Sequence, residues 1–243
     1  MTLLAEVKVQ GSRESGRGSA PRQMAVGNRI SLTPFLHVTR SALPSLWGGI
    51  SVSVGECKLG TGSTQTRKLI LGIAVSSFAI ELLLSEAWLR LARSGTVLAI
   101  LSGRGDPAVS VAAGLLLGLL VALASRLLFS TFGHRLTEEL FIPVFGCLYY
   151  RDAVAISLLP AFGEEILFRG VMQPELGLLA TSLVFGLMHS GLSRKLLPYG
   201  LWAAVVGALL GALYLWSGSL YGPVAAHALV NAAGIVWLKR LAV

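Results

Sequence analysis

Apolar residues in this chain form long runs that are separated by short polar segments. The runs cover residues 69–89, 107–129, 152–173, 176–190 and 199–216, and a last one begins at Pro223. A helix needs about 20 apolar residues to cross a bilayer. The pattern therefore predicts an all-α fold, a polytopic membrane helical bundle with about six transmembrane helices.

The segment between the second and third runs mixes polar and apolar residues. His134 and Arg135 stand one helical turn before Glu138 and Glu139, and apolar residues fall on another face. Such a distribution is typical of a helix that lies in the membrane interface. We therefore expect an interfacial helix here, followed by a connection that contains Pro143.

Residues 1–66 form a polar segment that is rich in Gly, Ser, Arg and Thr and has no sustained hydrophobic period. Three interpretations stay open: a disordered tail, an organellar transit peptide, or a start codon assigned too early. We divide the chain into this polar tail or targeting segment, residues 1–66, and a transmembrane domain, residues 67–243.

The composition agrees with a membrane protein, because 54% of the residues are hydrophobic and only 13% are charged. Soluble proteins carry about 25% charged residues. The net charge of +8 comes from Lys and Arg in the tail and in short loops, so we expect no nucleic-acid partner. Cys57 and Cys147 lack the spacing of a disulfide framework or a zinc site.

The positions of the basic loops predict the orientation of the chain. Most of them share one side of the predicted bundle, the side that also holds both termini: Arg67, Lys68, Arg135, Arg151, Arg194, Lys195, Lys239 and Arg240. By the positive-inside rule the termini are then cytoplasmic. We expect an integral, multi-pass protein of the bacterial inner membrane, with a plastid membrane as the alternative.

Three full charges interrupt the third apolar run. They are Glu164, Glu165 and Arg169. On insertion scales each charge at membrane depth costs on the order of 2.5 to 3.5 kcal/mol, so such residues usually serve a function. Glu165 and Arg169 are one helical turn apart and can form an ion pair. Glu164 is then left as a separate carboxylate on the helix surface.

Two later runs carry polar residues at the same spacing. His189 follows Phe185 by one helical turn, and Asn231 follows His227 by one helical turn. Counted from the predicted loops, Glu164, His189 and His227 reach similar depths, at about 1.5 Å per residue. A carboxylate, two imidazoles and an amide can therefore meet near the middle of the membrane.

Together these residues form three motifs that resemble those of a known family. The motifs are Glu164-Glu165-x-x-x-Arg169, Phe185-x-x-x-His189 and His227-x-x-x-Asn231. They resemble the CAAX-protease and bacteriocin-processing family, also called ABI, which contains intramembrane glutamic endopeptidases. The resemblance covers roughly residues 152–234. It implies an intramembrane protease, a hydrolase that cuts a membrane-delivered peptide or protein without a cofactor or metal.

Peptide hydrolysis requires an activated water molecule, donors for the oxyanion and a proton for the leaving amine. Glu164 is the candidate general base, and His189 helps to position or activate the water. His227 and Asn231 are the candidate oxyanion donors. The family resemblance implies the same four catalytic positions.

Three further residues have supporting roles in this interpretation. The Glu165–Arg169 pair is expected to be a structural ion pair, and Phe185 to pack against the site and limit solvent. Glu81, in the first apolar run, is expected to be a structural partner for another helix rather than a catalytic group.

Two alternatives stay open. The chain could be a non-catalytic membrane scaffold or bacteriocin-immunity-type protein of the same fold. It could also be a zinc metalloprotease, because Glu164, His189 and His227 are all possible zinc ligands. No HExxH motif is present, so we expect no metal. The expected partners are the lipid bilayer and a peptide or protein substrate, lipidated or not.

Overall fold

The computed structural model describes residues 61–101, 103, 105–146, 148–191 and 193–242. In these ranges the regular elements are helices, and no strand occurs among them. The predicted all-α fold class is therefore confirmed. The proposed tail up to residue 60, Cys57 and Cys147 lie outside the described residues, so the predictions made for them stay predictions.

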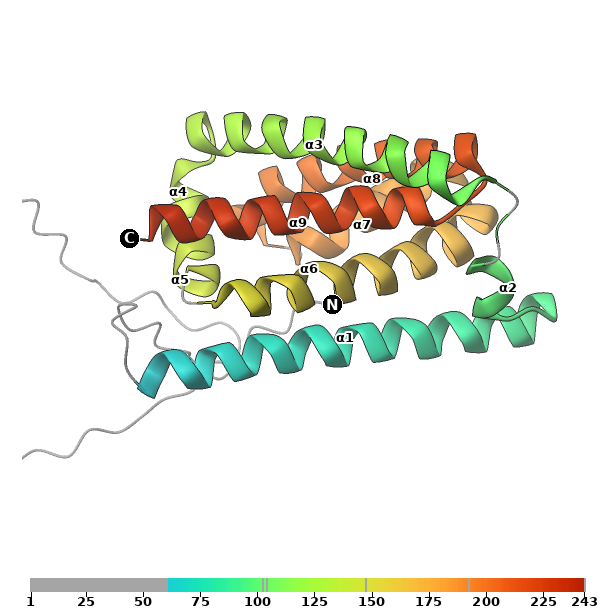
Figure 1. Ribbon diagram of the computed structural model, residues 1–243, viewed down its shortest axis with the longest axis horizontal. Coiled ribbons are helices and arrows are strands. Elements are labelled where there is room, and N and C mark those ends of the chain that lie inside the picture. Colours follow the sequence, from blue (N-terminus) through green and yellow to red (C-terminus); the bar gives the residue numbers. More distant parts are fainter. Residues whose placement is uncertain (1–60, 102, 104, 147, 192, 243) are drawn as a thin grey trace, which may run out of the picture. The chain divides into compact units, whose positions relative to one another are not determined.

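Six longer helices make up most of the described chain (Figure 1). They are α1 (Thr61–Arg93), α3 (Pro107–Thr131), α6 (Tyr150–Glu165), α7 (Gln173–Ser190), α8 (Leu197–Ser217) and α9 (Tyr221–Leu241). Short helical elements join them: α2 (Val97–Leu101), α4 (His134–Leu136), the π-helix η1 (Thr137–Phe141), α5 (Ile142–Phe145), the π-helix η2 (Ile166–Met172) and the 3₁₀-helix η3 (Arg194–Leu196). Elements α4, η1 and α5 occupy the segment where we predicted an interfacial helix.

Five helical stretches of the described chain are long and apolar enough to cross a membrane, where we predicted about six. The difference arises at Tyr150–Ser190, a stretch of 41 residues that joins α6, η2 and α7. We predicted two separate runs here, residues 152–173 and 176–190, with Pro174 between them. Pro174 instead stands in the first turn of α7, where a proline's missing N–H breaks no helical hydrogen bond.

This long stretch is interrupted at Gly177. Its φ of 79° and ψ of 169° are not helical, and only glycine adopts them readily. An unbroken helix would separate Glu164 and His189 by about 37 Å. Their side chains are instead 3.7 Å apart. The chain therefore reverses direction near Gly177, and the predicted third and fourth runs lie antiparallel.

Close helix packing holds the bundle together. Helix α3 packs on α9, and α7 packs on α8. A Cβ atom at Gly114 would lie 2.1 Å from the carbonyl oxygen of Gly222, and one at Gly118 would lie 2.8 Å from that of Ala226. These two glycines, one helical turn apart on α3, thus belong to the surface that contacts α9.

The start of α1 and the end of α9 lie at the same end of this bundle (Figure 1). Arg67 of α1 forms an ion pair with Asp152 at the start of α6. Lys239 of α9 donates a hydrogen bond to the carbonyl oxygen of Leu148, just before α6. The two ends of the helical part lie together in this way when the chain crosses the bundle an even number of times, as the predicted six helices would.

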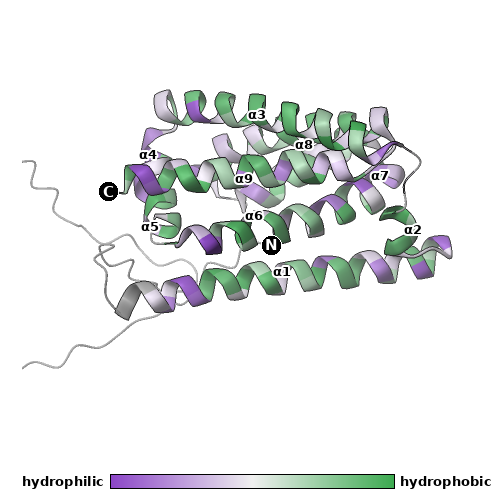
Figure 2. Cartoon of the chain, viewed as in Figure 1, coloured by the Kyte–Doolittle hydropathy of each residue, from purple (hydrophilic) through white to green (hydrophobic). Residues whose placement is uncertain are grey.

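The outer faces of the helices are strongly apolar. Figure 2 shows hydrophobic residues along most of α1 and α3. Leu83 of α1 is 70% exposed, and Leu116 and Leu127 of α3 are 62% and 66% exposed. Apolar surface of this extent is unfavourable in water and favourable against lipid tails. By length and composition, these helices are those of an integral membrane protein.

The α3–α9 contact gives a first prediction. We expect Gly114→Ala to lower the free energy of unfolding by about 1–3 kcal/mol, because the new methyl group meets the backbone of α9. Thermal unfolding of the purified protein in detergent measures the effect. Gly234→Ala in α9 is the control, since a Cβ there has no neighbour within 4 Å. Equal stability of the two variants would contradict the packing described here.

Candidate active site

The first part of the site lies where α6 passes into η2. Glu164 and Glu165 are the last two residues of α6, and Arg169 belongs to η2. Pro160 stands inside α6, one helical turn before Glu164. The regular α-helical hydrogen bonding changes to π-type immediately after Glu165. Single π-turns inside membrane or soluble helices are frequent at functional sites.

Glu165 and Arg169 form a buried ion pair. The distance from Arg169 Nε to Glu165 Oε2 is 3.0 Å, and the two side chains are 1% and 0% exposed. Arg169 Nη2 also donates a hydrogen bond of 2.9 Å to the carbonyl oxygen of Gly207 in α8. On its other side, Glu165 Oε1 lies 2.8 Å from His227 Nδ1. Glu165 is therefore held between a guanidinium and an imidazole.

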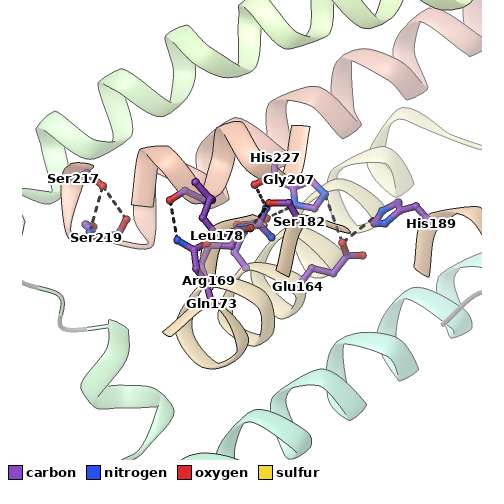
Figure 3. A network of polar contacts seen from close by, with 12 residues as sticks. Glu164, Arg169, Gln173, Leu178, Ser182, His189, Gly207, Ser217, Ser219 and His227 are labelled. Carbon is purple, nitrogen blue, oxygen red and sulfur yellow. Dashed lines mark hydrogen bonds and ion pairs between the residues drawn. The ribbon is translucent and has the colours of Figure 1, made fainter. Parts of the chain in front are cut away.

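Glu164 projects from a different side of α6 than Glu165. It faces the two histidines, His189 and His227 (Figure 3). Its Oε2 atom lies 3.7 Å from His189 Nε2 and 4.0 Å from His227 Nε2. Both distances are longer than a direct hydrogen bond. The Glu164 side chain is 18% exposed, whereas that of Glu165 is fully buried. The two adjacent glutamates thus have different environments.

The hydrogen bonds of the two histidines define which ring nitrogen faces Glu164. His189 Nδ1 lies 2.8 Å from the carbonyl oxygen of Phe185, and His227 Nδ1 lies 2.8 Å from the Glu165 carboxylate. Since both partners are acceptors, each Nδ1 carries the proton. Both Nε2 atoms are therefore turned toward Glu164.

Phe185 packs between the parts of the site. It is 2% exposed. Its ring centroid lies 4.3 Å from that of His189 and 6.0 Å from that of His227. The guanidinium of Arg169 lies 4.9 Å from the Phe185 ring centroid, which is a cation–π contact. The ring therefore separates the ion pair from His189.

A cavity of about 660 Å³ connects the predicted catalytic residues. Glu164, His189, His227 and Asn231 all line it, and most of its remaining wall is apolar. Asn231 is half-buried and stands one turn after His227 on α9. The structure thus brings the four predicted residues to one cavity, while the buried Glu165–Arg169 pair supports its wall.

Two features of the site were missed in the sequence. Tyr199 lines the same cavity, and its ring centroid lies 5.9 Å from that of His189. Tyr199 belongs to no sequence motif that we recognised, so its place in the site becomes visible only in the folded structure. Gln173 donates a hydrogen bond of 3.0 Å to the carbonyl oxygen of Gly211. Two glycines of α8, Gly207 and Gly211, thus accept hydrogen bonds from the polar side chains of Arg169 and Gln173.

We also tested the zinc alternative against the donor groups. In the part of the chain that the structure describes, no group of three His, Cys, Asp or Glu side chains is arranged to hold a metal ion.

The comparisons with known proteins agree with the motifs. Residues 147–233 match the family of Rce1-like type II CAAX prenyl endopeptidases. This range contains all three motifs and confirms the family resemblance. The protein YpbD of Bacillus subtilis (strain 168), described as uncharacterized, is 39% identical over 79 residues. That alignment covers 32% of this chain and 41% of the relative's length. No solved structure matches the chain.

The buried ion pair leads to a second prediction. Arg169→Ala leaves the Glu165 carboxylate buried without its cation, so we expect the free energy of unfolding to fall by about 3–5 kcal/mol. Thermal unfolding in detergent again provides the measurement. Arg90→Ala is the matched control, because its ion pair with Glu86 is exposed and should contribute little. A loss no larger than that of the control would argue against a structural role.

Proposed function

We propose that this protein is an intramembrane endopeptidase that hydrolyses a peptide bond of a membrane-delivered substrate, with Glu164 as the general base. The observation that carries this proposal is the position of the Glu164 carboxylate, 3.7 Å and 4.0 Å from two imidazole nitrogens at the wall of a largely apolar cavity. The match of residues 147–233 to a family of endopeptidases supports it.

The spacing around Glu164 suits an attacking water molecule. Polar atoms separated by more than 3.5 Å are commonly bridged by water. A water molecule between Glu164 Oε2 and His189 Nε2 can donate one hydrogen bond to each of these two acceptor atoms. Glu164 takes up one proton as the water attacks the carbonyl carbon, and then passes it to the leaving amine.

The oxyanion requires donors, and His227 can supply one only in its charged form. Its Nδ1 proton is already used toward Glu165, so Nε2 donates only when the ring is an imidazolium. The Glu165 carboxylate favours that charged form by its negative charge. The amide group of Asn231, one turn further along α9, provides the second donor.

Glu165 and Arg169 act in this scheme without touching the substrate. Glu165 orients the His227 ring through its 2.8 Å contact with Nδ1. Arg169 holds Glu165 and is itself fixed to the backbone of Gly207. We therefore assign both residues a positioning role.

The apolar walls of the cavity favour a substrate with an apolar peptide segment or a lipid chain near the cleaved bond. Because the matching family is described as CAAX prenyl endopeptidases, a farnesylated CAAX peptide is the first reporter substrate to test. We further propose that the end of the bundle with Arg67 and Lys239 faces the cytoplasm. The membrane would be the bacterial inner membrane or, alternatively, a plastid membrane.

The central test concerns Glu164. We expect Glu164→Gln to insert and fold normally but to cleave nothing, because the amide cannot accept the proton from water. Cleavage of the reporter peptide and a comparison of membrane proteomes with the wild type measure the loss and reveal trapped substrates. Glu175→Gln is the control, since Glu175 pairs with Arg93 at the opposite end of α7 from His189. A Glu164→Gln variant with a tenth or more of the wild-type rate would exclude this base.

A second experiment separates glutamate chemistry from zinc chemistry and from a scaffold role. We expect the rate to fall by about 10²–10³ in Asn231→Ala, with binding little changed, because one oxyanion donor is lost. We also expect the purified enzyme to survive prolonged chelation. Activity that chelation removes and zinc restores, with stoichiometric zinc in elemental analysis, would instead establish a metal mechanism. Function in cells that persists in Glu164→Gln would indicate a scaffold.

A further inference from the structure

Glu81 of α1 is a buried acid that the proposed mechanism does not use. It lies inside an apolar stretch, Thr64–Arg93, and is 8% exposed. Its Oε1 atom accepts a hydrogen bond of 2.8 Å from Ser77 Oγ. Its Oε2 atom is buried and has no hydrogen-bond partner among the described residues. One of the two carboxyl oxygens of Glu81 therefore has no hydrogen bond to replace the one that water would give it.

The Oε2 atom of Glu81 lies against Gly163 of α6. A Cβ atom at Gly163 would be only 2.1 Å from Oε2 and 3.3 Å from Cδ of Glu81. The carboxyl group can approach α6 this closely only because residue 163 has no side chain. Gly163 immediately precedes Glu164. Glu81 thus contacts the helical turn that carries the candidate base.

The surroundings of Glu81 favour a neutral carboxyl group. An ionised oxygen that is buried without a donor or a cation costs several kcal/mol, whereas a neutral acid costs much less. The charged groups that act on Glu81 include Glu164 on α6 and His227 on α9. Glu164 repels a second negative charge, and His227 already faces Glu165.

We propose that Glu81 is a positioning residue of the candidate active site, which holds a neutral carboxyl group against Gly163 and so fixes the turn that presents Glu164. Its effect on catalysis rests on the proposed function of Glu164. Its contact with Gly163 and its neutral state do not depend on that function. Three measurements test these parts separately.

The first measurement is spectroscopic and needs no substrate. Infrared spectra of the purified full-length protein at neutral pH should contain the carbonyl stretching band of a protonated carboxylic acid. Glu81→Gln should lose this band, and Glu86→Gln, which alters a partly exposed acid paired with Arg90 on the same helix, should keep it. A wild-type spectrum in which no such band depends on Glu81 would mean that the group is ionised, and would overturn the proposal.

The second measurement is a double-mutant cycle on thermal unfolding. Gly163→Ala should destabilise the protein because its methyl group meets the Glu81 carboxyl group. The same substitution in a Glu81→Ala background should cost clearly less. Gly72→Ala in α1 is the control, since a Cβ there has no neighbour within 4 Å. If Gly163→Ala costs the same in both backgrounds, the contact does not exist.

The third measurement compares rates on the reporter peptide. Glu81→Gln keeps the shape of the neutral acid and should retain most of the wild-type rate. Glu81→Ala should lose about tenfold or more in kcat, because a small misplacement of a catalytic group is costly. Loss of activity in Glu81→Gln, with the protein folded, would contradict a neutral positioning role.

The outcomes distinguish this proposal from the proposed function. If the wild type cleaves no peptide and Glu164→Gln traps nothing, the proposed function fails. The infrared band and the unfolding cycle then still decide whether Glu81 is neutral and contacts Gly163. If the wild type instead cleaves the peptide while no infrared band depends on Glu81 and the unfolding cycle shows no coupling to Gly163, only the inference about Glu81 fails.

Discussion

The burial of Arg169 is the constraint on which the rest of the site depends. A guanidinium inside an apolar bundle costs several kcal/mol unless an opposite charge lies next to it. Glu165 supplies the opposite charge, the Gly207 carbonyl oxygen accepts one N–H group, and the Phe185 ring covers the cation. Because these partners come from α6, α8 and α7, one side chain fixes three helices relative to one another.

His227 links the Glu165–Arg169 ion pair to the candidate catalytic residue Glu164. Glu165 uses one oxygen for Arg169 and the other for His227 Nδ1, so the imidazole has one defined orientation. Its Nε2 atom then faces Glu164. In the proposed mechanism, this structural ion pair thereby fixes the direction in which the His227 ring can donate a hydrogen bond. The second glutamate and the arginine are thus connected to the candidate base by direct contacts through His227.

Much of this arrangement follows from the sequence, because it depends on local periodicity. Apolar runs identify the helices, and the one-turn spacing puts each motif pair on one helix face. The reversal at Gly177 could not be derived in this way, since its φ of 79° is a property of the folded backbone and Pro174 misleadingly suggested a helix end. Tyr199 and the acceptor roles of Gly207 and Gly211 were also missed, because they arise only when α8 packs on α7 and η2.

The three consecutive residues Gly163, Glu164 and Glu165 illustrate how one helical turn can serve three functions. Successive side chains on a helix point about 100° apart. Glu164 therefore faces the cavity with 18% of its side chain exposed, and Glu165 faces the bundle interior with none exposed. Gly163 in turn faces α1, where the absence of a side chain admits Glu81. Two chemically identical carboxylates can thus serve as base and as anchor only because the helix turns them toward different surroundings. A rotation of α6 by about 100° would move each of these residues into the place of its neighbour, so the contacts on all three faces must hold at once.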